Sequence, residues 1–96
     1  MADKVKYVAE GKVSGGLASS FVVANFQAAI NNAVTLRGEG SGYVQADDAK
    51  VIAACDNYHN TIKDDKKLDG VVRIVKYPFS GGSGTVIKEY TYKKSN

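Results

Sequence analysis

Two β-prone segments joined by a glycine-rich loop occupy the last third of the chain, and they limit the fold more than any other part of it. Residues Val71–Phe79 and Thr85–Lys93 are rich in valine, isoleucine and tyrosine, which favour strands. The five residues Ser80–Gly84 suit a hairpin loop. Pro78 cannot donate a backbone hydrogen bond, so we expect it at a strand end or a sheet edge. The sequence therefore predicts an antiparallel β-hairpin.

The register of this hairpin follows once its apex is chosen. With Gly82 at the apex, three pairs face one another on one side: Lys76 and Lys88, Ile74 and Tyr90, Val72 and Tyr92. The opposite side carries Val75, Tyr77, Ile87 and Glu89. Both sides are partly apolar, so the pattern does not select the buried side, and a register shift of one residue would rearrange the pairs.

The start of the chain has the alternation of a half-buried strand. Odd-numbered residues from Val5 to Val13 are mainly apolar, and the even-numbered residues between them are mainly charged. The strand is expected to end at 14–16, where serine and glycine follow. A turn at 10–11 is the alternative, which we disfavour because Val13 continues the alternation.

The next segment predicts an amphipathic helix that ends near 31–32. Ser19 or Ser20 is suited to cap it. One apolar stripe recurs at helical spacing: Val22, Phe26, Ala29, Ile30 and Ala33. The competing interpretation is a strand over 20–26, because phenylalanine and valine form strands readily. The stripe persists for three turns, so we favour the helix.

Two more elements lie in the middle of the chain. Ala33–Arg37 is predicted to form a short strand, followed by a loop over 38–42 that contains three glycines. Asp47 is a suitable cap for a helix over about 48–63, with Asp48 at its positive end and Lys63 at its negative end. The apolar stripe of this helix consists of Val51, Ile52, Cys55, Tyr58 and Ile62. Residues 64–69 are expected to form a charged connector.

The expected order of elements is β-α-β-α-β-β. The economical architecture for this order is an α+β two-layer sandwich, with a mixed or antiparallel sheet of about four strands and two helices. The chain has 96 residues and no internal repeat or long linker, so we expect one small domain over residues 1–96.

Composition limits the class of protein. Charged residues make up 24% of the chain and apolar residues 44%, which is typical of globular domains rather than disordered segments. No apolar run approaches ~18 residues, so no membrane span or membrane partner is expected. The N-terminal sequence lacks the apolar segment of a secretory signal, which favours a cytoplasmic location in a cell or an infected host.

Residues able to carry catalysis or bind a metal are sparse. Cys55 and His59 are four residues apart on one helix face, but Cys55 lies in the apolar stripe and the chain has no further cysteine or histidine. The glycine-rich segment 38–42 has neither common phosphate-loop spacing. Asp47–Asp48 and Asp64–Asp65 are neighbours in sequence, and such neighbours rarely converge on a pocket. We therefore predict no catalytic residue, no metal and no cofactor.

One constellation of basic and aromatic residues stands out, and it lies in the predicted hairpin. From residue 70 to the end, five cations accompany a single acid, Glu89. Seven residues of this region are the candidate interface: Arg73, Lys76, Tyr77, Lys88, Tyr90, Tyr92 and Lys93. Tyrosine suits a protein interface because it offers a large area, few rotamers and one polar group.

The first functional hypothesis is a non-enzymatic binding or assembly module that acts through a protein interface, as in small accessory or structural proteins of viruses and mobile elements. Its partner is another protein or a second copy, and we expect a homo-oligomer built through a sheet edge or face. One alternative is a single-stranded nucleic-acid-binding domain, with lysines on phosphates and Tyr90 or Tyr92 stacked on bases. A second alternative is a small-ligand sequestering protein, whose pocket is formed by glycine-rich loops.

Overall fold

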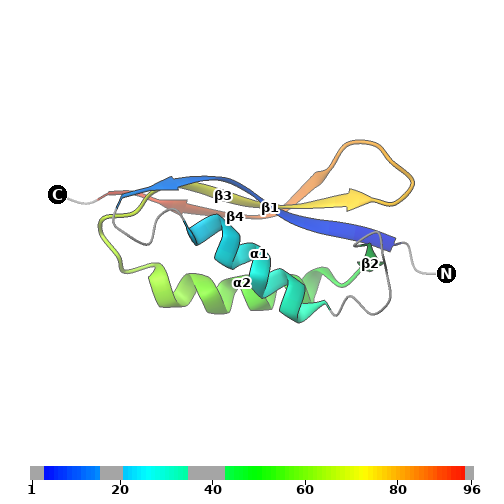
Figure 1. Ribbon diagram of the computed structural model, residues 1–96, viewed down its shortest axis with the longest axis horizontal. Coiled ribbons are helices and arrows are strands. Elements are labelled where there is room, and N and C mark those ends of the chain that lie inside the picture. The colour runs from blue at the N-terminus through cyan, green and yellow to red at the C-terminus, as the bar shows by residue number, and fades with distance from the viewer. Residues whose placement is uncertain (1–3, 16–20, 35–42, 95–96) are drawn as a thin grey trace.

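The computed structural model of the protein describes residues 4–15, 21–34 and 43–94, and shows a sheet with both helices on one of its faces (Figure 1). The elements are, in order, β1 (Lys4–Ser14), α1 (Val22–Ala33), β2 (Val44–Gln45), α2 (Asp48–Ile62), β3 (Asp69–Pro78) and β4 (Thr85–Tyr92). The predicted α+β class, element order and four-stranded sheet are confirmed.

The sheet is antiparallel throughout, with strand order β2-β1-β3-β4. Its centre is the long β1–β3 ladder, which runs from the Val5–Pro78 pair to the Ser14–Asp69 pair. β2 adds only two residues, paired with Lys4 and Val5. β4 therefore forms one edge of the sheet, and β1 forms most of the other.

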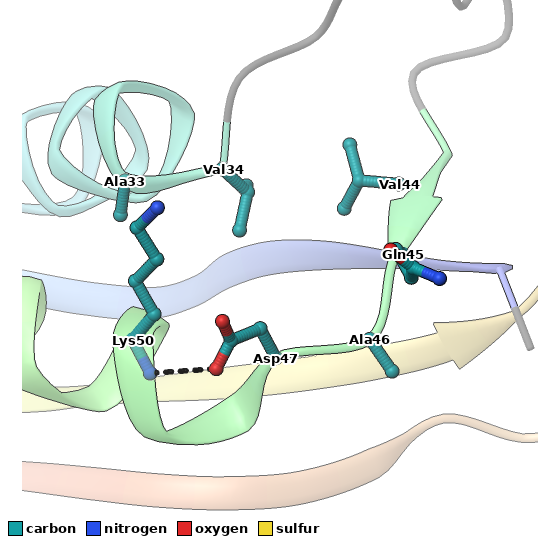
Figure 2. Close-up of a pocket in the computed structure, with 7 residues that line it drawn as sticks. All are labelled: Ala33, Val34, Val44, Gln45, Ala46, Asp47 and Lys50. Atoms are coloured by element: carbon teal, nitrogen blue, oxygen red, sulfur yellow. Dashed lines mark hydrogen bonds between the residues drawn. The ribbon is translucent and has the colours of Figure 1, made fainter. Parts of the chain in front are cut away.

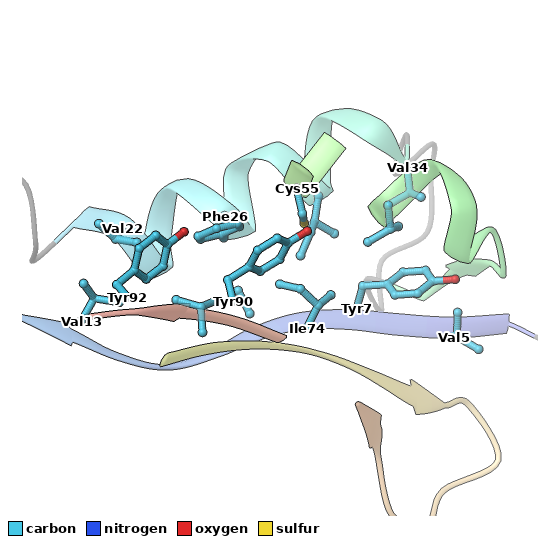
Figure 3. Packing of buried hydrophobic residues seen from close by; sticks show 14 of the residues in the cluster. Val5, Tyr7, Val13, Val22, Phe26, Val34, Cys55, Ile74, Tyr90 and Tyr92 are labelled. Atoms are coloured by element: carbon cyan, nitrogen blue, oxygen red, sulfur yellow. The ribbon is translucent and has the colours of Figure 1, made fainter. Parts of the chain in front are cut away.

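The core lies between the sheet and the two helices (Figure 3). The apolar residues of β1 face the helices, as their alternation predicts. Phe26 of α1 and Cys55 of α2 are fully buried in this core. The alternative turn at 10–11 does not form. Gly11 instead continues the strand with a φ of +124°, and a Cβ atom there would collide with the carbonyl oxygen of Val71.

The helices are largely as predicted. The side chain of Asp47 caps α2 by accepting a hydrogen bond from the backbone N–H of Lys50 at 3.2 Å. In α1, however, the capping position is occupied by Phe21, whose side chain makes no capping hydrogen bond. The predicted caps Ser19 and Ser20 lie outside the described residues. Neither helix in the described ranges is long and apolar enough to cross a membrane.

The prediction of a strand over 33–37 is wrong at its start, because Ala33 is the last residue of α1. Val34 follows as the extended C-cap, and residues 35–42 lie outside the described part of the chain. The second strand of the described chain is β2, at Val44–Gln45. It forms because β1 offers an edge there, which is a tertiary effect that a local pattern does not contain.

The register of the β3–β4 hairpin also differs from the prediction. Ile74 pairs with Lys88 and Val72 with Tyr90, which is a shift of two residues from the predicted pairs. Between Ile74 and Val75 the register changes again, because Val75 pairs with Val86 and leaves Ile87 unpaired in a β-bulge. A shift of two preserves the face of each side chain, so the predicted division into two faces still holds for all but Ile87. Pro78 ends β3, as predicted.

Candidate protein interface at the β4 edge

Three buried tyrosines of the sheet reach across the core to α2. The hydroxyl of Tyr90 donates to Oδ1 of Asp56 at 2.6 Å, and that of Tyr92 bonds with Nδ1 of His59 at 2.8 Å. Figure 3 shows the two rings side by side, with their hydroxyls directed toward the helix layer. The third, Tyr7, makes the same kind of contact at the N-terminal end of α2. α2 is thus tied to both β1 and β4.

Tyr7 anchors the N-terminal end of α2. Its hydroxyl donates to Oδ1 of Asp48 at 2.6 Å and accepts from the backbone N–H of Asp47 at 2.8 Å. The ammonium of Lys76 donates to the other oxygen of Asp48 at 2.9 Å. The hydrogen bond from Tyr7 is the main reason that the pKa of Asp48 is lowered.

Four of the seven candidate interface residues face the helices. Tyr90 and Tyr92 are only 4% and 5% exposed, so their rings belong to the core rather than to the surface. Burial raises the pKa of both phenols. Lys76 is engaged with Asp48, and the ammonium of Lys88 lies over the Tyr90 ring, 5.8 Å from its centre.

The other candidates lie elsewhere. Arg73 is on the helix-free face of the sheet, where its Nε donates to Oε2 of Glu89 at 2.9 Å. Tyr77 is on the same face, and its hydroxyl donates to Glu10. Lys93 is exposed just beyond the end of β4. The seven residues therefore do not form one surface, although the four that face the helices are those that the sequence placed together.

A small apolar cluster covers part of the helix-free face. Val75 is 5% exposed, and it lies outside the main core. Any Cβ atom at Gly84 would overlap the side chains of Val75 and Tyr77, so the end of the hairpin loop packs directly on both. Val86, which pairs with Val75, stays half exposed. The hairpin end thus curls away from the helices (Figure 1).

The β1 edge is covered over residues 4–9, where β2 and a side chain of α1 bond to it, unlike the β4 edge. Along β1, the side-chain amide of Gln27 accepts a hydrogen bond from the N–H of Ala9 at 2.9 Å and donates to the carbonyl of Tyr7 at 3.1 Å. Gln27 thus occupies the place of a neighbouring strand over these two residues. Sequence reasoning missed it, because nothing in its spacing distinguishes it from the other amide side chains of α1.

The outward backbone groups of β4 can be identified from the ladder. The N–H of Phe79 donates to the carbonyl of Lys4 at 3.0 Å, so odd-numbered residues of β3 bond toward β1. The even-numbered residues of β3 then bond toward β4, where their partners are Lys88, Tyr90 and Tyr92. Glu89 and Thr91 therefore direct their N–H and C=O groups away from the sheet, and no described residue bonds to these groups.

The described residues give little support for a metal site or a reactive cysteine. Within the described ranges, no three carboxylate, histidine or cysteine side chains lie together as metal ligands. Cys55 is buried, which raises the pKa of its thiol to about 12 and disfavours the reactive thiolate. His59 bonds to Tyr92 rather than to Cys55.

A surface pocket lies between the end of α1 and the start of α2 (Figure 2). Its volume is about 240 Å³, and small-molecule sites usually span about 300–1,000 Å³. Its charged lining residues, Asp47 and Lys50, are both exposed, and Asp47 is already used as the cap of α2. The pocket therefore gives little support to a small-ligand function.

Comparison with known proteins identifies no related protein. No protein-family model, curated protein or solved structure matches this chain significantly.

Proposed function

We propose that the protein is a non-enzymatic binding module that takes up a β-strand of another protein chain at the outer edge of β4. In such strand addition, main-chain hydrogen bonds supply affinity and alternate side chains supply specificity. The observation that carries the proposal is the free edge itself, because the main-chain groups of Glu89 and Thr91 point away from β3 and meet no described residue.

The contrast with residues 4–9 of the opposite edge supports this proposal. There, β2 pairs with Lys4 and Val5, and Gln27 pairs with Tyr7 and Ala9. Exposed edges promote unwanted pairing, and proteins usually blunt them. On β4 the bulge at Ile87 limits the accessible length, but the stretch from Lys88 to Tyr92 remains regular. An edge left open over this length fits a binding role.

The rigidity of β4 supports it further. Tyr90 and Tyr92 alternate with the outward residues Glu89 and Thr91, and both rings are bonded to α2. The strand is therefore held in its extended conformation before any partner arrives. A preorganised edge loses little conformational entropy on binding, which favours affinity.

A selection from random peptides tests the proposal, because the protein itself then chooses the strand that it binds. We expect the enriched peptides to be extended and rich in β-branched residues. Their binding should slow amide hydrogen exchange at Glu89 and Thr91. Peptides that protect another surface, and leave these two amides unchanged, would contradict the proposal.

A matched pair of variants sharpens this experiment. Thr91→Pro removes an outward N–H without removing a hydrogen bond to β3, so it should weaken peptide binding while the protein stays folded. Thr91→Val keeps the N–H and should bind as the unaltered protein does. Equal binding by both variants would argue against main-chain recognition.

A further inference from the structure

The geometry points to a second copy of this chain as the strand that β4 takes up, paired antiparallel about a two-fold axis beside Thr91. This inference rests on the proposed function. It adds the identity of the partner, the register and the size of the assembly. The charges along the outward side of the strand favour this partner.

Few registers are open to two identical β4 strands. Only residues with outward main-chain groups can form the hydrogen-bonded pairs of an antiparallel ladder, and these are Glu89, Thr91 and, if the strand continues, Lys93. Directly opposed residues also share a face of the sheet. The registers that remain place Glu89 opposite the partner's Glu89, Thr91 or Lys93.

Charge selects among these three. Glu89 opposite Glu89 brings two carboxylates together, which is destabilising. Glu89 opposite Thr91 leaves the carboxylate without a new partner. Glu89 opposite Lys93 places opposite charges together on both sides of the axis, and Thr91 then faces its own copy. The third register is therefore favoured by charge complementarity.

The third register also gives the longest ladder. Its hydrogen-bonded pairs are Thr91 with Thr91 at the axis and Glu89 with Lys93 on either side, and each pair exchanges two main-chain bonds. The carboxylate of Glu89 already holds Arg73 at 2.9 Å on this face, so Lys93 of the second copy would extend an existing ion pair into a network.

One contact opposes this register. Lys88 would face Lys94 of the second copy on the helix side of the sheet. The ammonium of Lys88 is held over the ring of Tyr90, and Lys94 is exposed beyond the strand, where its side chain can turn into water. Attraction and repulsion between solvent-accessible charges are both weak and both screened by salt, so the two Lys88–Lys94 pairs reduce the preference from charge, and the longer ladder of this register favours it as well.

The assembly closes at two copies. Joining the two β4 edges makes one continuous sheet of eight strands and uses the same surface on both chains. The outer edges of that sheet are then the two copies of β2 and β1, where Gln27 already pairs with Tyr7 and Ala9. Both β4 edges are then used in the two-fold contact, so a third copy has no free β4 edge to join.

Cysteine crosslinking reads out the register directly. Residues opposed in a hydrogen-bonded pair have Cα atoms about 5.5 Å apart, within the range that a disulfide spans. We expect Thr91→Cys to form a covalent dimer under mild oxidation and Glu89→Cys to form none, while Glu89→Cys with Lys93→Cys forms one. The buried Cys55 stays unreacted as an internal reference.

A charge swap gives an independent readout in solution. Lys93→Glu should weaken the dimer about tenfold, as judged from mass by light scattering against concentration. Adding Glu89→Lys exchanges the two charges and should restore association. The circular dichroism spectrum of each variant is the control, because it shows whether a variant that no longer dimerises is still folded.

The possible results separate this inference from the proposed function. A dimer in which Glu89→Cys crosslinks and Thr91→Cys does not would overturn the register. Another result is a protein that stays monomeric at high micromolar concentration while selected peptides still protect Thr91. That result would contradict self-association and would remain consistent with the binding of another protein's strand. If no selected peptide slows amide exchange in β4 and the chain is monomeric, both the proposed function and the dimer are contradicted.

Discussion

The side-chain amide of Gln27 bonds to two main-chain groups of β1, the N–H of Ala9 at 2.9 Å and, from its Nε2, the carbonyl of Tyr7 at 3.1 Å. A helix side chain thus serves one sheet edge as a strand would. Because the two β1 residues are buried, these groups have little access to water without the amide.

Gln27→Ala should therefore destabilise the protein by about 1–3 kcal/mol, because it leaves a donor and an acceptor unpaired. Urea denaturation measures the change. Gln45→Ala is a suitable control, since Gln45 is exposed and should have little effect. A stability change at Gln27 no larger than that of the control would show that water replaces the amide.

Alkaline pH should unfold the protein through its buried tyrosines. Burial is the main cause that raises the pKa of Tyr7, Tyr90 and Tyr92 in the folded state. Their stabilising contribution is complete below the unfolded pKa of about 10 and is lost as the pH rises above it, because only the unfolded chain then releases these protons. Tyrosinate absorbance should rise together with the loss of near-ultraviolet circular dichroism. Ionisation of all six tyrosines in a folded protein would contradict this.

Mild acid should weaken the fold through His59. Its pKa is lowered, first by burial and then by Lys63 and Lys88, although Asp56 acts in the opposite direction. A lowered folded pKa means that stability is complete above the unfolded value of about 6.5 and declines as the pH falls below it. The free energy of unfolding should therefore be smaller near pH 5.5 than near pH 7.5. In His59→Gln this difference should shrink, and an unchanged difference would assign it to another group.

Cys55 should be inert in the native protein. It is fully buried between the helices and the sheet, so thiol reagents should label it only at the rate of unfolding. Cys55→Ser should destabilise by about 1–3 kcal/mol because a hydroxyl is then buried, and Cys55→Ala should cost somewhat less. Rapid labelling of the folded protein would show that this part of the core opens locally.

Single-stranded nucleic acid should bind weakly. Base stacking needs exposed rings, but Tyr90 and Tyr92 are buried, and Lys76 is engaged with Asp48. A labelled 20-mer should show no binding below about 10 μM at low salt. Tighter binding with a steep dependence on salt would support a nucleic-acid function that uses residues other than Tyr90, Tyr92 and Lys76.

Much of the fold was predictable because it follows from the spacing of apolar residues within single segments of the sequence. The alternation from Val5 to Val13 and the apolar stripe around Val51 each follow from burial of one side of an element. The cap at Asp47 follows from the chemistry of its side chain and does not depend on distant parts of the chain.

The remainder depends on contacts distant in sequence. The hairpin register depends on a bulge at Ile87, near the point where Gly84 packs on Val75 and Tyr77. Strand β2 exists only because Lys4 and Val5 offer an edge. Both faces of the hairpin are partly apolar, so the side on which the helices pack cannot be read from the pattern.

The candidate interface shows the same division. The sequence placed Tyr90 and Tyr92 on one face with Lys88, which is correct, but exposure depends on where α2 lies. The free edge of β4 is set by strand order, a global property that no single segment carries. The role of Gln27 is likewise hidden until α1 is placed beside β1.

The alternation along β4 has a consequence for how such a chain can evolve. Tyr90 and Tyr92 serve the core through their bonds to α2, whereas Glu89 and Thr91 lie on the helix-free side. If β4 binds a partner strand as proposed, folding and recognition depend on alternate residues of one short segment. Substitutions at Glu89 and Thr91 would then alter which strand is bound, while Tyr90 and Tyr92 keep the fold stable.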